Sequence, residues 1–229
     1  MADENTIFDE RAAAHYEDWY GTPEGRRADA LEKAAVRRLL QGAPRARSIL
    51  EVGCGTGHFT RWLGERGLAP VGLDRSAPML SQARALNGAP LVMGDAHRLP
   101  FADGAFDLAA FVTTLEFLER PSEALAEAMR VARRGLLLGV LNHWSPLGLW
   151  RRLVGLFRPT VYDAARFYSV GELRRRLRAL AGGEARILWH TTLFPRGCPW
   201  QRANAPWGGF IAMALLLPTE EGSTGEARA

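Results

Sequence analysis

Three glycines occupy every second position in the stretch ILEVGCGTGHFTRW (residues 49–62), at Gly53, Gly55 and Gly57, and Glu51 lies two positions before the first of them. Glycine allows positive φ angles and lets a ligand approach the backbone closely. The helix expected after this loop offers free N–H groups and the positive end of its dipole. The stretch therefore predicts a loop that binds a cofactor through its backbone.

The spacing of the loop separates two classes of cofactor. A dinucleotide fingerprint, G-x-G-x-x-G, uses its third glycine for close packing of helix and strand. Counted from Gly53, the sixth position is His58, so the pattern is E-x-G-x-G-x-G instead. S-adenosylmethionine is poor in phosphate and needs less of the helix dipole, and its amino-acid end would use the loop backbone and a nearby acid. The loop therefore favours S-adenosylmethionine over a nicotinamide dinucleotide.

Two further carboxylates follow at the ends of the next expected strands, Asp74 in VGLD and Asp95 in VMGD. Asp74 can accept both ribose hydroxyl protons, and Asp95 can accept from the adenine amino group while the Ala96 N–H faces a ring nitrogen. One such acid alone is typical of a solvated strand end. Together with Glu51, they stand at three neighbouring strand ends beside a glycine loop, which indicates a cofactor site.

If the cofactor is S-adenosylmethionine, its methyl group would leave the sulfonium by in-line displacement, and a base would be needed only if the acceptor carries a proton of high pKa. His143, after the fifth expected strand, and Glu116, after the fourth, are the candidates for that base. The alternative for His143 is a packed or capping histidine, and the alternative for Glu116 is a solvated loop acid. Of the other histidines, His58 caps a helix or touches the cofactor, His97 lies near adenine, and His190 is a strand residue.

The sequence indicates no metal site. The two cysteines, Cys54 and Cys198, form neither a CxxC pair nor a disulfide framework, and no cluster of histidine and cysteine has ligand spacing. Alkyl transfer from a sulfonium needs no Lewis acid, so we expect no metal requirement.

Strands and helices alternate between residues 48 and 142. The expected strands are 48–52, 70–74, 91–95, 106–113 and 135–142, and the expected helices are 28–41, 58–66, 78–86 and 122–131, the last with Ser122 as N-cap. This alternation predicts a doubly wound, mostly parallel α/β sheet. Residues 185–194 and 208–217 predict two closing strands that form an antiparallel edge, giving about seven strands.

Four ordered segments, LEVGCGTG, VGLDRSAPML, GDAHRLPFADGAFDLA and RVARRGLLLGVLN, resemble the class I S-adenosylmethionine-dependent methyltransferases. They are most similar to the small-molecule group (methyltransferase type 11) that includes the ubiquinone-biosynthesis enzymes, and the resemblance covers residues 5–142. It implies a Rossmann-like methyltransferase fold, S-adenosyl-L-methionine as cofactor, S-adenosyl-L-homocysteine as product and a small-molecule acceptor.

The resemblance also assigns site residues. The cofactor-binding set it implies is Tyr16, Glu51, Gly53, Cys54, Gly55, Gly57, Asp74, Arg75, Asp95, Ala96 and Thr113. The segment FDERAAAHYEDWY resembles one that folds over the cofactor, where Tyr16 would close the pocket, and the alternative for Tyr16 is a helix aromatic packed on the core. Many relatives carry two histidines after the fourth strand, whereas this chain has Glu116 and Phe117.

The chain is expected to form a single methyltransferase domain. Its parts are an N-terminal helical cap (1–45), a cofactor-binding core (46–143), a helical lid (144–183), closing strands (184–218) and a loose tail (219–229). The lid is rich in aromatic residues and arginine. These are Trp144, Trp150, Phe157, Phe167 and Tyr168, with Arg151, Arg152, Arg158 and Arg166. They could hold a planar, lipophilic or anionic acceptor, or they could attach the lid to the sheet and face water.

Composition excludes several other functions. The net charge of +4 is spread over the chain and 28 of the 29 basic residues are Arg, which is typical of a solvated surface, so we expect no nucleic-acid partner. Lys33 is the only lysine, so a Tyr-x-x-x-Lys oxidoreductase pair is impossible. The longest apolar run, residues 210–217, is too short to span a bilayer, and we expect a cytoplasmic protein. The alternatives kept open are a lipophilic acceptor, a quinone or lipid, methylated at a membrane surface, indicated by LGLWRRLVGLF, and a non-catalytic S-adenosylmethionine-binding protein. The oligomeric state is left open.

Overall fold

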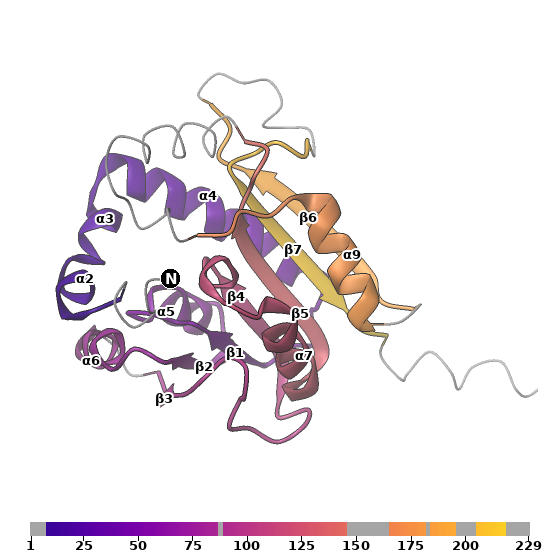
Figure 1. Cartoon of the computed structure of the whole chain (residues 1–229), viewed down its shortest axis with the longest axis horizontal. Helices are drawn as coiled ribbons and strands as arrows, with labels where there is room; N and C mark the ends of the chain where they lie inside the picture. The colour runs from indigo at the N-terminus through magenta and orange to yellow at the C-terminus, as the bar shows by residue number, and fades with distance from the viewer. Residues whose placement is uncertain (1–7, 87–88, 146–164, 182–183, 196–204, 219–229) are drawn as a thin grey trace, which may run out of the picture.

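The computed structural model describes residues 8–86, 89–145, 165–181, 184–195 and 205–218. Within these residues, seven strands form one sheet in the order β3-β2-β1-β4-β5-β7-β6 (Figure 1). The strands are β1 (Ser48–Val52), β2 (Ala69–Asp74), β3 (Leu91–Met93), β4 (Phe106–Val112), β5 (Ala132–Leu141), β6 (Arg186–Thr192) and β7 (Phe210–Leu216). The first five run parallel, and β7 runs antiparallel to both β5 and β6. The predicted doubly wound sheet with an antiparallel edge is confirmed.

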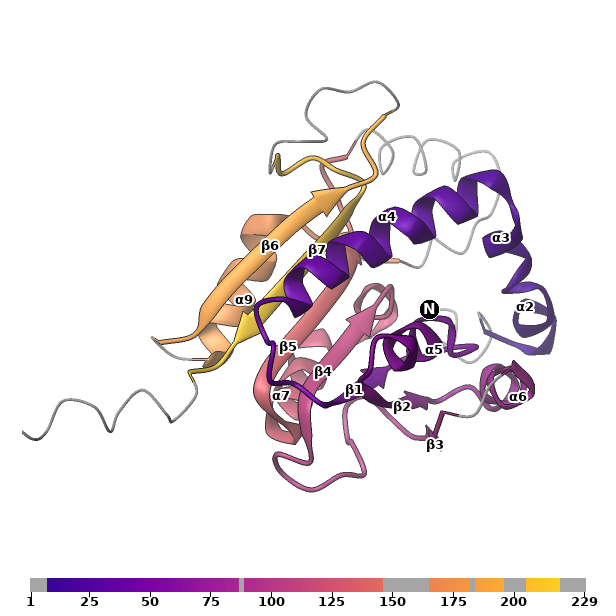
Figure 2. The same ribbon diagram turned by 180° about the vertical axis from the view of Figure 1, so that it is seen from behind.

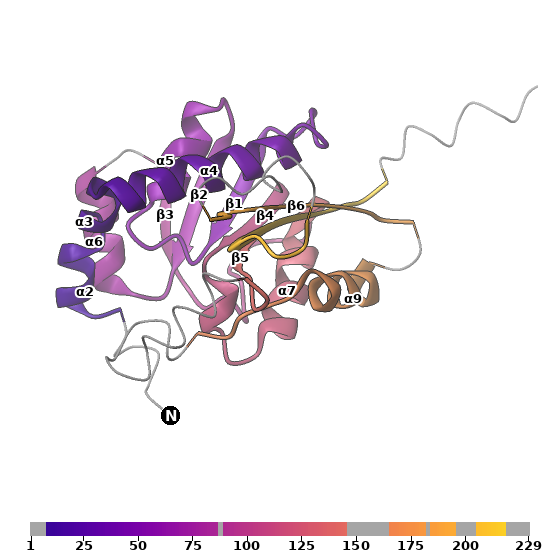
Figure 3. The same ribbon diagram turned by 90° about the horizontal axis from the view of Figure 1, so that it is seen from above.

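Helices cover both faces of this sheet. The helices α4 (Pro23–Leu40) and α5 (His58–Glu65) pack on one face, and α7 (Pro121–Val131) and α9 (Val170–Ala181) pack on the other (Figure 3). Alternate residues of the fully buried β4 face the two sides: Leu108 and Ala110 join the core under α4 and α5, while Ala109 and Phe111 join the other core. Because both faces are covered, most residues of the inner strands are apolar, and Glu51 of β1 and Asp107 of β4 are buried exceptions.

The N-terminal part of the chain lies over the other end of the sheet from the antiparallel edge. It contains the short helices α2 (Glu10–His15) and α3 (Asp18–Gly21) and leads into α4, which crosses the sheet toward β6 and β7 (Figure 2). Helix α2 packs against α6 (Ala77–Leu86), which itself lies beside β2 and β3. This arrangement brings residues 8–16 over the carboxyl ends of the first three strands.

Helices α4, α6 and α7 begin earlier than the sequence-based expectation, α6 and α7 by one residue each. Helix α4 begins before residue 28 because the Thr22 hydroxyl accepts a 2.9 Å hydrogen bond from Gly25 N and Pro23 occupies the first turn. The prediction that Ser122 caps α7 is wrong. That helix starts at Pro121 without a side-chain cap, and the Ser122 hydroxyl instead accepts from Arg176 Nη1 of α9 at 2.9 Å.

Much of the predicted lid lies outside the described residues. Trp150, Arg151, Arg152, Phe157 and Arg158 fall in 146–164, and Cys198 falls in 196–204. What is described of this region is Trp144, the extended segment 165–168 and helix α9. None of the described helices has the length and apolar character that crossing a membrane requires.

Candidate functional site

A cavity of about 460 Å³ lies at the carboxyl ends of the parallel strands. Its wall is built from five parts of the chain: the N-terminal segment, the glycine loop after β1, and the segments that follow β2, β3 and β4. The predicted cofactor residues that line it are Tyr16, Gly53, Gly55, Asp74, Arg75, Asp95, Ala96 and Thr113. A cavity of this size and position is typical of a small-molecule site in an open α/β sheet.

The glycine loop has the left-handed backbone that its composition predicts. The φ angles of Gly53, Gly55 and Gly57 are 73°, 54° and 76°. A Cβ atom on Gly53 would lie 2.1 Å from Thr114 Cγ2, whereas one on Gly55 would meet nothing within 4 Å. Gly55 therefore leaves open space at the cavity wall. Gly57 is the N-cap of α5 and does not line the cavity.

Asp74 lies at the end of β2, where it lines the cavity and holds the glycine loop. Its Oδ2 accepts from Gly55 N and its Oδ1 from Ser76 N, each at 2.8 Å. Burial raises the pKa of Asp74, and these backbone hydrogen bonds partly oppose the rise because they stabilise the charged form. The carboxylate is therefore fixed in position beside Gly55, where the loop leaves open space.

Two predicted cofactor residues, Glu51 and Cys54, lie behind the loop and are absent from the cavity wall. Glu51 is 2% exposed and its carboxyl accepts a short hydrogen bond from the Thr60 hydroxyl of α5. Burial raises the pKa of Glu51 to about 8 and also raises the pKa of the Cys54 thiol. The described hydrogen bond of Glu51 joins β1 to α5, and its charge interacts with that of Asp74 in the cavity wall.

The segment after β3 forms the next part of the wall. Asp95, Ala96 and His97 all line the cavity, and Asp95 Oδ1 accepts from His97 N at 2.9 Å and lies 2.7 Å from His97 Nδ1. Burial opposes ionisation of Asp95, but the hydrogen bonds from His97 outweigh it and lower the pKa of this carboxyl. The segment thus presents a carboxylate and a backbone amide side by side, as adenine recognition would require.

The N-terminal segment forms another part of the cavity wall. Phe8, Asp9, Glu10 and Tyr16 line it. Phe8 is held twice, because its carbonyl accepts from the Ser76 hydroxyl at 2.8 Å and its ring packs edge-to-face on Phe117 at 5.3 Å. Tyr16 was predicted to lie here from the sequence, whereas the Phe8–Phe117 pair was not, although Phe8 begins the FDERAAAHYEDWY segment.

A polar cluster fastens the same segment to α5. Glu17 accepts from Arg61 Nη2 at 3.1 Å and from the Thr56 hydroxyl, and its Oε2 lies 3.5 Å from His58 Nδ1. Partial burial opposes ionisation of Glu17, but the interactions with His58, Thr56 and Arg61 outweigh it and lower its pKa to about 2. His58 stacks on Tyr20 with ring centroids 3.6 Å apart, and its Nε2 lies 2.8 Å from Asp29 Oδ1 of α4. His58 is absent from the cavity wall. Its described contacts instead connect the helices α3, α4 and α5.

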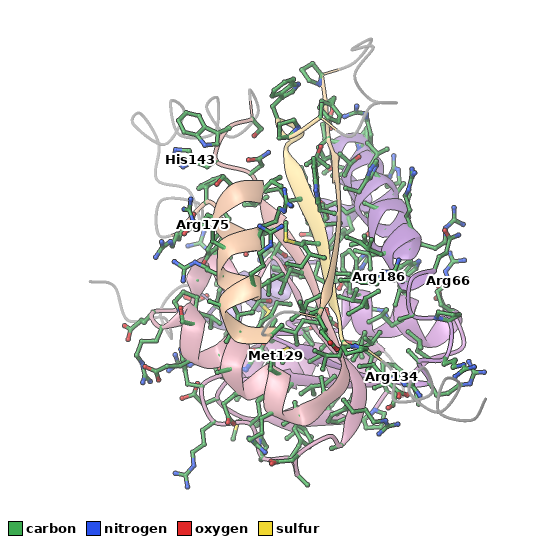
Figure 4. All side chains as sticks on the ribbon, turned by 90° about the vertical axis from the view of Figure 1, so that its right-hand side faces the viewer. Arg66, Met129, Arg134, His143, Arg175 and Arg186 are labelled. Carbon is green, nitrogen blue, oxygen red and sulfur yellow. The ribbon has the colours of Figure 1, made fainter. Side chains whose placement is uncertain are left out.

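The two candidate bases lie outside the cavity wall. Glu116 is 2% exposed, so the alternative of a solvated loop acid is wrong, and its Oε1 accepts from Leu141 N at 2.6 Å. His143 follows β5, its backbone N donates to Tyr168 O at 2.7 Å, and its ring packs on Trp144 at 4.8 Å. Figure 4 places His143 at the opposite end of β5 from Arg134. A role of either residue as base stays a prediction.

Thr113 directly follows β4 and lines the cavity with an unusual backbone conformation. Its φ angle of 49° is rare for a residue other than glycine. Its N–H donates to Gly139 O of β5 at 2.7 Å, and its hydroxyl donates to Val112 O at 2.8 Å. Backbone strain of this kind clusters at functional sites, which agrees with the position of Thr113 at the cavity wall.

Comparison with known proteins gives a family for this arrangement. Residues 50–139 match the model of a methyltransferase domain. A solved structure from Thermotoga maritima, a SAM-dependent methyltransferase described as a possible histamine N-methyltransferase, superposes with a TM-score of 0.76 at 29% identity, covering 94% of this chain and 100% of that one.

Curated relatives match over a shorter part of their length. An uncharacterized protein of Mycobacterium tuberculosis is 35% identical over 170 residues, which are 73% of this chain and 57% of that protein. The malonyl-[acyl-carrier protein] O-methyltransferase of Pectobacterium atrosepticum is 33% identical over 151 residues, 59% of each chain. The chain thus spans less than two thirds of the length of these relatives.

Proposed function

Since the chain carries a class I S-adenosylmethionine-dependent methyltransferase domain, we propose that the protein transfers a methyl group from S-adenosylmethionine to a small-molecule acceptor. The observation that carries the proposal is the pair formed by Gly55 and Asp74. An open, positive-φ glycine and a fixed carboxylate 2.8 Å from its amide stand together in the wall of a cavity of about 460 Å³. The volume suits a ligand of this size.

The residues of the wall fit the cofactor part by part. The backbone at Gly53 and Gly55 would hold the amino-acid end, and Asp74 would accept from the ribose hydroxyls. Asp95 and the Ala96 N–H would hold adenine, because a carboxylate and an amide side by side match the amino group and ring nitrogen of that base. Bound there, S-adenosylmethionine supplies a methyl group attached to a positively charged sulfonium.

The acceptor would approach from the side of the cavity formed by the segment after β4. The wall there consists of Thr113, Thr114, Phe117 and Leu118, which supply apolar surface and hydroxyl groups. None of these side chains is a base at neutral pH. Catalysis in this proposal depends mainly on positioning the acceptor atom in line with the sulfur–methyl bond, as suits an acceptor that needs little help with deprotonation.

Two measurements test the proposal. Titration calorimetry with S-adenosylhomocysteine and with NAD should show binding of the first alone. Transfer of a radiolabelled methyl group should then be assayed over small phenols, quinones, amines and acids, together with a malonyl group on an acyl carrier protein, the acceptor named for one relative. Binding of NAD without S-adenosylhomocysteine would refute the cofactor. Binding without transfer to any acceptor would favour the non-catalytic alternative.

A second candidate is methylation of a lipophilic acceptor at a membrane surface. Trp144 and Trp207 are 70% and 43% exposed. Trp144 N donates to Asn142 Oδ1 at 3.1 Å, and the Asn142 amide donates at 2.7 Å to the carbonyl of Pro206, the residue before Trp207. Exposed tryptophan at one end of a molecule is typical of interfacial binding. Flotation with vesicles of anionic phospholipid tests this: binding that is lost in Trp144→Ser with Trp207→Ser supports it, and no flotation of the wild type refutes it.

A further inference from the structure

Glu116 is a fully buried carboxyl group at the junction of three segments. It lies in the 3₁₀ turn η1 (Leu115–Phe117) after β4 and is 2% exposed. Its Oε1 accepts from Leu141 N, at the end of β5, at 2.6 Å. Its Oε2 has no hydrogen-bond partner among the described residues. One oxygen of the carboxyl therefore joins η1 to β5, and the other is buried without a described hydrogen-bond partner.

The third segment is the extended stretch 165–168. Glu116 O accepts from Arg166 N at 2.8 Å, and the buried Tyr168 hydroxyl donates to Leu115 O at 3.0 Å. On the other side, Tyr168 N donates to Leu141 O at 3.1 Å. The stretch is thus hydrogen-bonded both to η1 and to the end of β5, the same two elements that the Glu116 side chain connects.

The turn that carries Glu116 is also part of the cavity wall. Thr114, Phe117 and Leu118 line the cavity, and Phe117 packs on Phe8 of the N-terminal segment. Within the turn, Phe117 N donates to Thr114 O at 3.0 Å. A shift of Glu116 would therefore move side chains that face the ligand.

We propose that Glu116 is a positioning residue whose carboxyl sets the 114–118 wall of the cavity relative to β5 and to segment 165–168. The inference rests on the proposed function, because the wall matters only if the cavity holds the cofactor and admits an acceptor beside it. The Glu116 side chain is absent from the cavity wall. In this proposal Glu116 therefore acts on the ligand by positioning its neighbours and not as a general base.

The charges around Glu116 give the proposal a measurable signature. Strand β5 contributes the Leu141 N–H, and segment 165–168 contributes the Tyr168 phenol and Arg166, whose guanidinium pairs with Glu172 of α9 at 2.9 Å. Within the described chain, Glu116 forms no ion pair. Burial accordingly raises the pKa of Glu116 to about 8, so the group is largely protonated at neutral pH and ionises in mild alkali.

The test compares Glu116→Gln, Glu116→Ala and a control, Glu123→Gln, at an exposed carboxylate of α7. Gln is nearly isosteric with the protonated acid and keeps the acceptor for Leu141 N. Affinity for S-adenosylhomocysteine is measured by calorimetry at pH 6.5 and pH 9. Hydrogen exchange of peptides covering 136–145 and 165–172 is followed by mass spectrometry and corrected for the intrinsic effect of pH.

At pH 6.5 we expect Glu116→Gln and the control to match the wild type. Glu116→Ala should bind about tenfold more weakly and exchange faster in both peptides, because a buried N–H loses its acceptor. At pH 9 the wild type should weaken and exchange faster in both peptides, while Glu116→Gln should respond less, because only other groups such as Glu51 still ionise in that variant.

An identical response of wild type and Glu116→Gln to pH would overturn the inference, as would a folded Glu116→Ala with unchanged affinity and exchange. If Glu116→Ala does not fold, the difference in pH response between the wild type and Glu116→Gln still tests the inference. If the wild type binds no S-adenosylhomocysteine, the proposed function fails, and the exchange data alone decide whether Glu116 positions these segments.

Discussion

Asp74 Oδ2 accepts a hydrogen bond of 2.8 Å from Gly55 N, so the carboxylate at the end of the second strand is joined directly to the loop after the first. The bond places the charge of Asp74 where a ribose would lie if the amino-acid end of the cofactor rests on Gly55. It also means that Asp74 contributes both to the shape of the loop and to ligand contacts.

Replacing Asp74 by Ala should weaken S-adenosylhomocysteine binding by about 1 to 3 kcal/mol, the usual loss when hydrogen bonds to a buried charged group are removed. Calorimetry on the folded variant measures this. Asp103→Ala, at a carboxylate that is 81% exposed and outside the cavity, is the matched control and should bind normally. Equal affinity in both variants would reject the ribose role of Asp74.

Gly55→Val should abolish detectable cofactor binding, because the side chain would occupy the open space at the cavity wall. Gly67→Val is a matched control. Both glycines have positive φ, at 54° and 83°, and an added Cβ meets nothing within 4 Å at either, so the backbone strain is comparable. Thermal unfolding should show similar losses of stability in the two variants, while calorimetry should separate them. Loss of binding in both would mean that strain, and not the position, is responsible.

Glu17→Gln should speed the release of S-adenosylhomocysteine, because Glu17 fastens the N-terminal segment to Thr56 and Arg61 beside the glycine loop. Stopped-flow displacement measures the rate, with Asp18→Asn, at the exposed neighbouring acid, as control. Folding stability gives a second check. The pKa of Glu17 is lowered from 4.5 to about 2. The contribution of Glu17 to the free energy of unfolding is therefore fully present above pH 4.5 and is lost as the pH falls toward 2. The difference in stability between wild type and Glu17→Gln should shrink over that range.

Glu51 should make the protein less stable as the pH rises. Its pKa is raised from 4.5 to about 8, so between these values the folded state binds a proton that the unfolded state has released. The free energy of unfolding should therefore fall between pH 4.5 and pH 8 and level off above it. In Glu51→Gln that part of the fall should be missing, as urea titrations at a series of pH values would show. Parallel curves for the two proteins would contradict the assigned pKa.

Several parts of the site were predictable because their causes are local or follow from sheet geometry. The positive φ angles of the loop require glycine at Gly53, Gly55 and Gly57. Parallel strands end at the same edge, so acids at the ends of consecutive strands, such as Asp74 and Asp95, come to one cavity. Burial on both faces makes the central strands mostly apolar, and their alternation with helices along the chain identified the sheet.

The spacing of residues in the sequence does not show whether a side chain faces the cavity or packs behind its wall. Glu51 and Gly57 belong to the same motif as Gly55, yet packing against α5 and the start of that helix place them behind the cavity. Glu116 reads as a loop acid, and only the approach of β5 and segment 165–168 buries it. These outcomes depend on contacts between distant parts of the chain.

The sequence by itself therefore determined the fold class, the glycine loop and the row of acids that indicate the cofactor, because each follows from backbone conformation, strand order or residue type. Only the tertiary structure decided how the site is closed and supported. Phe8 reaches Phe117, and Glu17 reaches Arg61, across long stretches of chain. Such pairs form because the folded sheet brings their elements together, and nothing in the residues adjacent to either partner specifies the other.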